Sequence, residues 1–133
     1  MNEKRRGALK DVLKKIDDFR GKQGEEYKAL QKKLEEVEHE LEELLGEVQT
    51  EVQEWVDEIN GIKEEEEEAL DNMPDGLKEG EKGERAQAAI EAMGTAIDAL
   101  EEIVNLSFDE VRDGEGLDKL DEAEGGVQEA IDA

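Results

Sequence analysis

The sequence predicts an all-α protein built around one long heptad-patterned helix, with shorter helices folded back along it. Three observations support this prediction. Apolar residues recur at steps of three and four over long stretches, which is the period of a helix buried on one face. No alternating apolar and polar run and no Asn-Gly hairpin is present, so no strand is expected. Aromatic residues make up 3% of the chain, too few for a large globular core.

The first predicted helix covers residues 2–20 and carries one apolar stripe. The residues of this stripe are Leu9, Val12, Leu13, Ile16 and Phe19. Two glycines follow within Gly21-Lys-Gln-Gly24, and paired glycines supply the left-handed conformations in which helices stop. We therefore expect the helix to end at residues 21–24 and to fold back along the next one.

A second, much longer helix is predicted over residues 25–70. Its apolar seam has heptad spacing with one stutter, and consists of Leu30, Leu34, Val37, Leu41, Leu44, Val48, Val52, Trp55, Ile59 and Ile62. At 1.5 Å per residue this helix is about 65–70 Å long. Trp55 occupies a seam position near the middle of the long helix and is expected to anchor the packing. The residues predicted to form the core or a homodimer seam are Leu34, Leu41, Val48, Trp55, Ile59 and Ile62.

The only proline marks the main loop, predicted over residues 71–84. Pro74-Asp-Gly76 is typical of a turn, and Gly80 and Gly83 follow it. A third helix is predicted over residues 84–105, with an apolar stripe and small residues that permit close helix approach. The stripe comprises Ala86, Ile90, Met93, Ile97, Leu100 and Val104, and the small residues are Ala89, Ala92, Gly94, Ala96 and Ala99.

The last stretch, residues 107–133, reads as a glycine-rich tail of short helices that is only partly ordered. Ser107-Phe-Asp-Glu110 has the pattern of a capping box and predicts a short helix. Four apolar residues with helical spacing follow, interrupted by glycines: Leu117, Leu120, Val127 and Ile131. The sequence thus divides into an acidic helical hairpin or coiled-coil domain, residues 1–106, and this tail. Because the core is thin, homodimerisation is expected to complete it.

Charge excludes several classes of function. The 133 residues carry 17 Lys and Arg against 41 Asp and Glu, a net charge of −24, which excludes direct binding to nucleic acid or to an anionic membrane. Without cysteine and with a single histidine, His39, the chain lacks the ligands of zinc, iron–sulfur and di-iron sites, so no metal site or cofactor is expected. An EF-hand pattern at residues 109–120 fails at its twelfth position, where Leu120 replaces the bidentate Glu. A narrow hairpin offers no dry pocket to separate the pKa values of two carboxyl groups, so the protein is not expected to be an enzyme.

The negative charge is concentrated in the long helix. Residues 1–24 have eight basic and four acidic groups, whereas residues 35–72 have 17 acidic groups and one basic group. Pairing of the basic helix with the acidic one inside the chain is therefore expected. On the side opposite the seam, neighbouring acids lie about 5–6 Å apart, a spacing similar to that of phosphates along a nucleic-acid strand. This predicted acidic face comprises Glu35, Glu36, Glu42, Glu43, Glu54, Asp57, Glu64, Glu67 and Glu68.

Three segments resemble a family of small acidic proteins encoded by bacteriophages and other mobile elements. They are Met1-Asn-Glu-Lys-Arg-Arg6, the loop Asp71-Asn-Met-Pro-Asp-Gly-Leu77 with Gly83-Glu84 after it, and the Ala-Ile-Asp-Ala-Leu-Glu-Glu run at 96–102. In that family an Asp-Asn-Met/Leu-Pro-x-x-Leu loop joins a long acidic helix to an Ala/Leu/Glu helix. Gly80 stands here where the family has Ser. The resemblance implies a phage origin, and phage inhibitors of restriction and CRISPR systems are often acidic DNA mimics.

These observations favour a protein inhibitor that presents carboxylate rows, as a nucleic-acid mimic, to the basic groove of a host nucleic-acid-binding protein. Its expected location is the cytoplasm of the host cell, since no apolar run approaches the roughly 18 residues of a membrane span. Two other functions fit the same pattern. One is a structural coiled coil for phage assembly or scaffolding, and the other is an adaptor for a basic protein.

Overall fold

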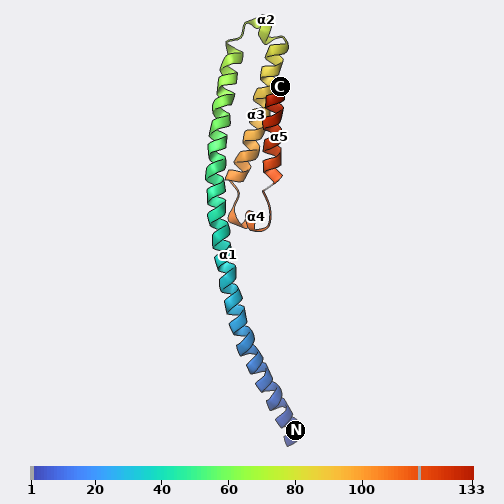
Figure 1. The fold of residues 1–133 in the computed structure, drawn as a ribbon. Coiled ribbons are helices and arrows are strands. Elements are labelled where there is room, and N and C mark those ends of the chain that lie inside the picture. Colours follow the sequence, from blue (N-terminus) through green and yellow to red (C-terminus); the bar gives the residue numbers. More distant parts are fainter. Residues whose placement is uncertain (1, 117) are drawn as a thin grey trace. The chain divides into compact units, whose positions relative to one another are not determined.

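The protein is a set of five helices in a computed structural model that describes residues 2–116 and 118–133 (Figure 1). The helices are α1 (Glu3–Asp71), α2 (Asp75–Lys78), α3 (Glu81–Val104), α4 (Phe108–Arg112) and α5 (Asp118–Asp132). Within the described residues there is no strand, which confirms the all-α prediction. Met1 and Leu117, which entered the family resemblance and the apolar spacing of the tail, lie outside the described residues.

The predicted break at residues 21–24 is wrong, because α1 runs through it without interruption. Gly21 and Gly24 lie inside the helix, and neither belongs to the glycines with positive φ, Gly114 and Gly116. A glycine permits a helix stop but does not impose one; within a helix it costs only about 1 kcal/mol relative to alanine. The flanking Lys, Gln and Glu residues are good helix formers, so the helix continues. The basic residues 2–20 therefore precede the acidic stretch on the same helix, and the predicted fold-back at residues 21–24 does not occur.

Contacts divide the chain into two compact units, Met1–Glu40 and Leu41–Ala133. The described part of the first unit consists of the N-terminal stretch of α1. Its helix begins after Asn2, whose side-chain Oδ1 accepts a hydrogen bond from the backbone N–H of Arg5 at 2.9 Å. This is the N-cap geometry that satisfies one of the free donors of a helix start. The apolar side chains of this stretch, including Leu9, Ile16 and Phe19, are exposed.

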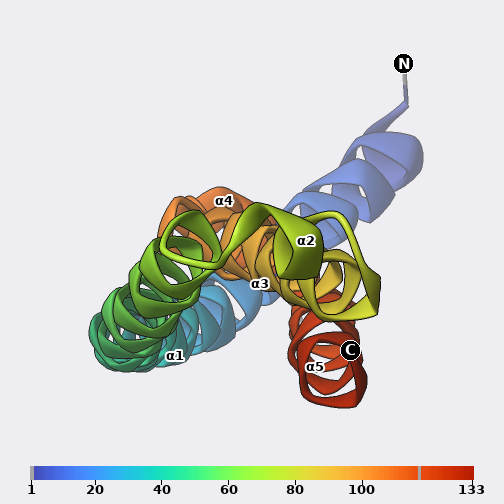
Figure 2. The same cartoon turned by 90° about the horizontal axis from the view of Figure 1, so that it is seen from above.

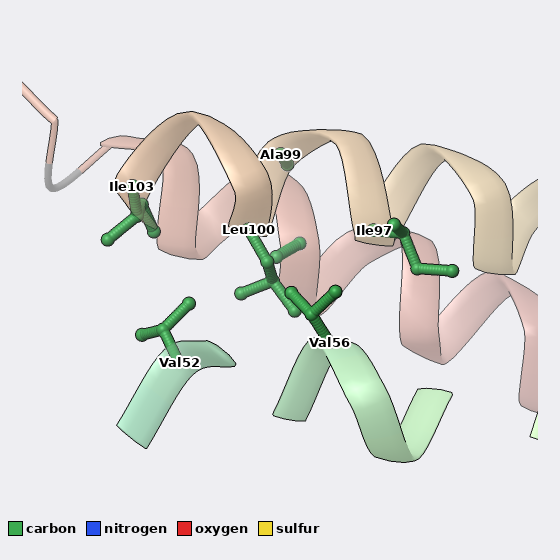
Figure 3. Packing of buried hydrophobic residues seen from close by; sticks show 7 residues of the cluster. Val52, Val56, Ile97, Ala99, Leu100 and Ile103 are labelled. Carbon is green, nitrogen blue, oxygen red and sulfur yellow. The ribbon is translucent and has the colours of Figure 1, made fainter. Parts of the chain in front are cut away.

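In the second unit, α3 lies between the C-terminal stretch of α1 and α5 (Figures 1 and 2). On one side of α3, Ile97, Leu100 and Ile103 pack in one cluster with Val52 and Val56 of α1, which are each only 1% exposed (Figure 3). The cluster buries both valines almost completely and holds α1 against α3.

A neighbouring side of α3 contacts α5 through small residues. A Cβ atom added to Gly126 of α5 would lie 3.0 Å from the carbonyl oxygen of Ala92 and 2.9 Å from the backbone nitrogen of Ala96. The α5 residues Ala123 and Gly126 are buried there. Two of the small residues predicted to permit close approach in α3, Ala92 and Ala96, do so, and the close neighbour is α5.

The loop between α1 and α3 contains the predicted turn. The carbonyl oxygen of Pro74 accepts hydrogen bonds from the backbone N–H groups of Leu77 and Lys78, both at 2.9 Å, which begins the four-residue α2. A Cβ on Gly83 would overlap the backbone of Lys78, so only glycine permits this tight return. Helix α3 begins at Glu81, three residues before the predicted start.

The tail is joined to the rest of the unit by polar contacts as well as by α5. The predicted capping box is confirmed, with Ser107 and Glu110 exchanging side-chain to backbone hydrogen bonds. Gln49 Nε2 donates to the carbonyl oxygens of Leu106 at 2.9 Å and Ile103 at 3.3 Å, and so ties α1 to the end of α3. Lys119 Nζ lies 2.8 Å from Glu102 Oε2 and joins α5 to α3.

The predicted seam of α1 is only in part the core of the chain. Val52 is buried and Ile59 packs against the core cluster, but Trp55 is 41% exposed and is not a packing anchor within the chain. Val56, one residue later, takes that role. The buried side of α1 is therefore rotated away from the predicted seam, because α3 and α5 approach from one flank of it. The remaining predicted core or seam residues are half-buried or exposed: Leu34, Leu41, Val48 and Ile62.

Candidate partner-binding surface

The nine predicted carboxylates all lie on α1. Eight are exposed, and Glu67 is half-buried; the exposed ones are Glu35, Glu36, Glu42, Glu43, Glu54, Asp57, Glu64 and Glu68. Within the second unit, the helical spacing of the seven residues from Glu42 to Glu68 places them along one side of α1. We call these nine residues the acidic face. Glu35 and Glu36 belong to the first compact unit and the other seven to the second.

Part of this surface is paired with neighbouring side chains. Lys63, the basic residue of the 35–72 stretch, lies 3.2 Å from Glu67 through its Nζ atom, one helical turn away. Asp57 Oδ1 accepts a hydrogen bond from Gln53 Nε2 at 3.0 Å, which fixes the carboxylate without changing its charge. His39 is exposed, as predicted from its place outside the seam. The acidic face therefore keeps most of its negative charge exposed to solvent.

The charge density of this stretch matches that of one DNA strand. Residues 35–72 carry 17 acidic groups. At 1.5 Å per residue they cover roughly 57 Å of helix axis, or about one negative charge per 3.4 Å. A single strand of duplex DNA carries one phosphate per about 3.4 Å of its axis. Along the helix axis, counted over all sides of the helix, the carboxylates of this stretch are therefore as dense as the phosphates of one nucleic-acid strand.

Between α1 and α5, above α3, the second unit has an apolar groove made of two adjoining hollows. Both are lined by Ile59 of α1 and Val127 of α5, and the larger has a volume of about 540 Å³. We call this the α1–α5 groove. Its remaining apolar lining includes Trp55, Ile62, Ala89, Met93, Leu120 and Ile131. Sequence reasoning missed the groove; the signal was the helical spacing of Leu120, Val127 and Ile131, which sits on a helix packed against α3.

A polar cluster at the other end of the unit centres on Lys119. Hydrogen bonds from its ammonium group to the carboxylates of Glu102 and Glu122 hold the pKa of Lys119 well above its usual range. The lysine is charged at every physiological pH and serves as a tie between α3 and α5. Within residues 2–116 and 118–133, no group of three or more His, Cys, Asp or Glu side chains is placed to hold a metal ion.

Uncompensated charge on α1 gives the protein a dependence on salt. Raising the salt concentration from about 0.01 M to about 0.15 M shortens the Debye length from about 30 Å to about 8 Å and screens repulsion between carboxylates. We expect the melting temperature, followed by circular dichroism at 222 nm, to rise by a few degrees over this range. A melting temperature that falls on adding salt contradicts net self-repulsion as the dominant electrostatic effect.

Comparison with protein-family models, with curated proteins and with solved structures finds no match to this chain. No helix in the described part of the chain combines the length and apolar character needed to cross a lipid bilayer.

Proposed function

We propose that the protein is an acidic inhibitor of phage type, which occupies the basic groove of a host nucleic-acid-binding protein in place of nucleic acid. The observation that carries this proposal is the acidic stretch of α1, residues 35–72, whose 17 carboxylates, counted over all sides of the helix, have the same density along its axis as the phosphates of one DNA strand. The target class is a restriction or CRISPR nuclease complex in the cytoplasm of the host cell. The carboxylates contact the target, and the buried contacts of α1 with α3 keep their spacing.

The physical basis of inhibition is the same as that of DNA binding. Lysine and arginine side chains in the target groove exchange their counterions for carboxylates, and this release drives association. A rigid helix has its carboxylates already in position and loses less conformational entropy on binding than a disordered acidic tail does. Because the inhibitor occupies the groove, duplex DNA and the inhibitor exclude each other.

Affinity capture tests the proposal. The immobilised protein is incubated with a bacterial lysate at low salt, and bound proteins are eluted either with duplex DNA or with a salt step to about 0.5 M, which weakens multi-contact ionic complexes by orders of magnitude. We expect nucleic-acid-binding enzymes in both eluates. If only the protein itself is retained, or if duplex DNA elutes nothing, the proposal fails.

A structural role in phage assembly is the second candidate, and the observation that favours it is the exposed apolar stripe of α1. Leu30, Leu34 and Val37 are each more than half exposed, which is typical of helices that associate with other helices. A scaffold of this kind keeps its assembly properties when acidic residues are neutralised. An inhibitor instead loses its binding to the target, and this difference separates the two candidates.

Neutralising part of the acidic face is expected to abolish inhibition without unfolding the protein. Replacing Glu64, Glu67 and Glu68 by Gln removes three charges at nearly constant helix propensity. Local repulsion decreases, so the melting temperature stays level or rises, even though the Lys63–Glu67 pair is lost. Binding to a captured target weakens by about tenfold or more, and its dependence on salt becomes shallower because fewer ionic contacts form.

The matched control removes three exposed charges elsewhere, at Glu84, Glu101 and Glu129, and keeps the acidic face intact. Titration of the target with both variants at several salt concentrations shows whether the loss of binding comes from the acidic face itself or from the lower net charge. Equal binding by the two variants removes residues 64–68 from the mechanism.

A further inference from the structure

Because α1 is one uninterrupted helix, its two apolar stripes form a single pattern. Along residues 9–62 every seam position is three or four residues from the next. The seam positions are Leu9, Val12, Ile16, Phe19, Gln23, Tyr27, Leu30, Leu34, Val37, Leu41, Leu44, Val48, Val52, Trp55, Ile59 and Ile62. Gln23 is the one polar residue among them. We call this set the α1 stripe.

The spacing of the α1 stripe, as a series of steps of three and four residues, is the same counted from either end. A regular heptad repeat is symmetric by construction, so the informative features are the two places where it is interrupted by an extra step of four. These are residues 19–27 and residues 44–52, and they lie at equal distances from a centre between Leu34 and Val37. Every member then has a partner, such as Leu9 with Ile62 or Ile16 with Trp55, whose residue numbers add up to 71. Two antiparallel copies of the helix therefore bring their stutters together, which keeps both seams facing each other along the full length.

Most of the stripe has no cover within the chain. Phe19, Tyr27 and Leu30 are each about 65% exposed, and Trp55 and Ile62 are 41% and 52% exposed. Only Val52 is buried, by α3. A stripe of exposed apolar residues this long is costly in water, and burying it against a second helix stabilises the pair.

The α1–α5 groove fits the N-terminal end of a second copy. Trp55, Ile59 and Ile62 contribute to its lining. We call two residues whose numbers add up to 71 mirror partners, and the antiparallel alignment that pairs them the mirror register. The mirror partners of these three lining residues are Ile16, Val12 and Leu9. A helix lying there contacts α5 as well as α1. It therefore needs a wider apolar face, which Leu13 supplies at this end of the stripe. Three charged residues line the larger hollow: Glu66, Lys82 and Arg85. The mirror partner of Glu66 is a cation, Arg5, and Arg85 is paired with Glu81 within the chain.

Charge favours the same arrangement. In the mirror register, residues 2–24, with eight basic and four acidic groups, lie opposite residues 47–69, with ten acidic groups and one basic group. Lys4, Arg5 and Arg6 are placed opposite residues 65–67, which are all Glu. A parallel pair of helices places the acidic stretches side by side and repels itself.

We propose that two copies of the chain form an antiparallel homodimer along α1, in which the N-terminal stretch of each copy fills the α1–α5 groove of the other. Each end of the dimer is then a four-helix bundle of α1, α3 and α5 from one copy and residues 2–24 of the second. The contact is isologous, with each stripe packing on itself, so the assembly closes at two copies. This inference does not depend on the inhibitor function.

Sedimentation equilibrium of the full chain tests the assembly. We expect twice the chain mass of 14.9 kDa for the wild type and for Ala29→Glu, which adds one charge to an exposed position off the stripe. Val12→Glu adds the same charge to the stripe and yields the single-chain mass. Because Val12 is exposed in the single chain, the helical signal of the second unit at 222 nm is retained. A monomeric wild type, or a Val12→Glu variant that remains dimeric, overturns the proposal.

Cysteine cross-linking tests the register, since the chain has no native cysteine. The double variant Ile16→Cys, Trp55→Cys places both thiols in one layer of the mirror register, and mild oxidation is expected to convert it to a covalent dimer. Along one helix these positions are too far apart to react with each other. Ile16→Cys alone, and the pair Ile16→Cys, Ile62→Cys, stay uncross-linked. Cross-linking of Ile16→Cys alone indicates a parallel dimer and overturns the proposal, whatever the outcome of the inhibition experiments.

Discussion

Val56→Asp is expected to lower the free energy of unfolding by about 3 kcal/mol or more, because it places a carboxylate in the apolar cluster between α1 and α3. Val56 is only 1% exposed and packs in one cluster with Ile97 and Leu100. The described part of this cluster has no cation to pair with the new charge. For a single unit with a thin core, this loss is a large fraction of the total stability.

Thr50→Asp provides the matched control, since it adds the same charge at an exposed position of α1 two helical turns from Val56. Urea unfolding followed by circular dichroism gives both stabilities. We expect the control within about 0.5 kcal/mol of the wild type. If the two aspartates have the same effect, then α1 does not pack on α3 through this cluster.

Gly126→Leu is the second large change, and it acts on the contact between α3 and α5. A Cβ at this position already lies 3.0 Å from the Ala96 Cβ and 3.0 Å from the Ala92 carbonyl oxygen. A leucine side chain forces α5 away from α3 and opens the contact around Ala123. Overpacking of this kind costs about 1–3 kcal/mol and sometimes more. We expect a cost at the upper end, because backbone atoms cannot move aside as side chains do.

The neighbouring glycine supplies the control for this experiment. Gly125 is exposed, and a Cβ there meets nothing within 4 Å. Gly125→Leu is expected to leave the stability unchanged or raise it slightly, because glycine is a poor helix former. Thermal melts of both variants, with hydrogen exchange of α5 amides, give the comparison. A Gly126→Leu variant as stable as Gly125→Leu contradicts the close packing of α5 on α3.

Local signals predicted much of this fold. The capping box at Ser107, the turn at Pro74 and the buried stripe of α3 depend on short-range chemistry, and all three are present. The predicted stop at Gly21 and Gly24 failed because glycine changes the cost of a helix by an amount that neighbouring residues offset. Short-range rules cannot rank such near-equal alternatives.

The position of the core on α1 needed information from other helices. Trp55 and Val56 are adjacent, and both continue a helical spacing through Val52 or Ile59. Which of them is buried depends on the side from which α3 approaches. That side cannot be inferred from the sequence of α1 alone. The acidic face was predictable because charged residues remain exposed whichever way the helix turns.

The continuity of α1 has an electrostatic consequence of its own. The aligned peptide units of a helix give its N-terminus a partial positive charge and its C-terminus a partial negative one. Lys4, Arg5 and Arg6 stand at the positive end of α1 and residues 64–68, all Glu, near the negative end, so the side chains oppose the helix macrodipole at both ends. Each end of α1 is weakened in isolation, and an antiparallel neighbour brings to it charge of the opposite sign. The ends of this helix are therefore the places where its stability depends most on what lies beside it.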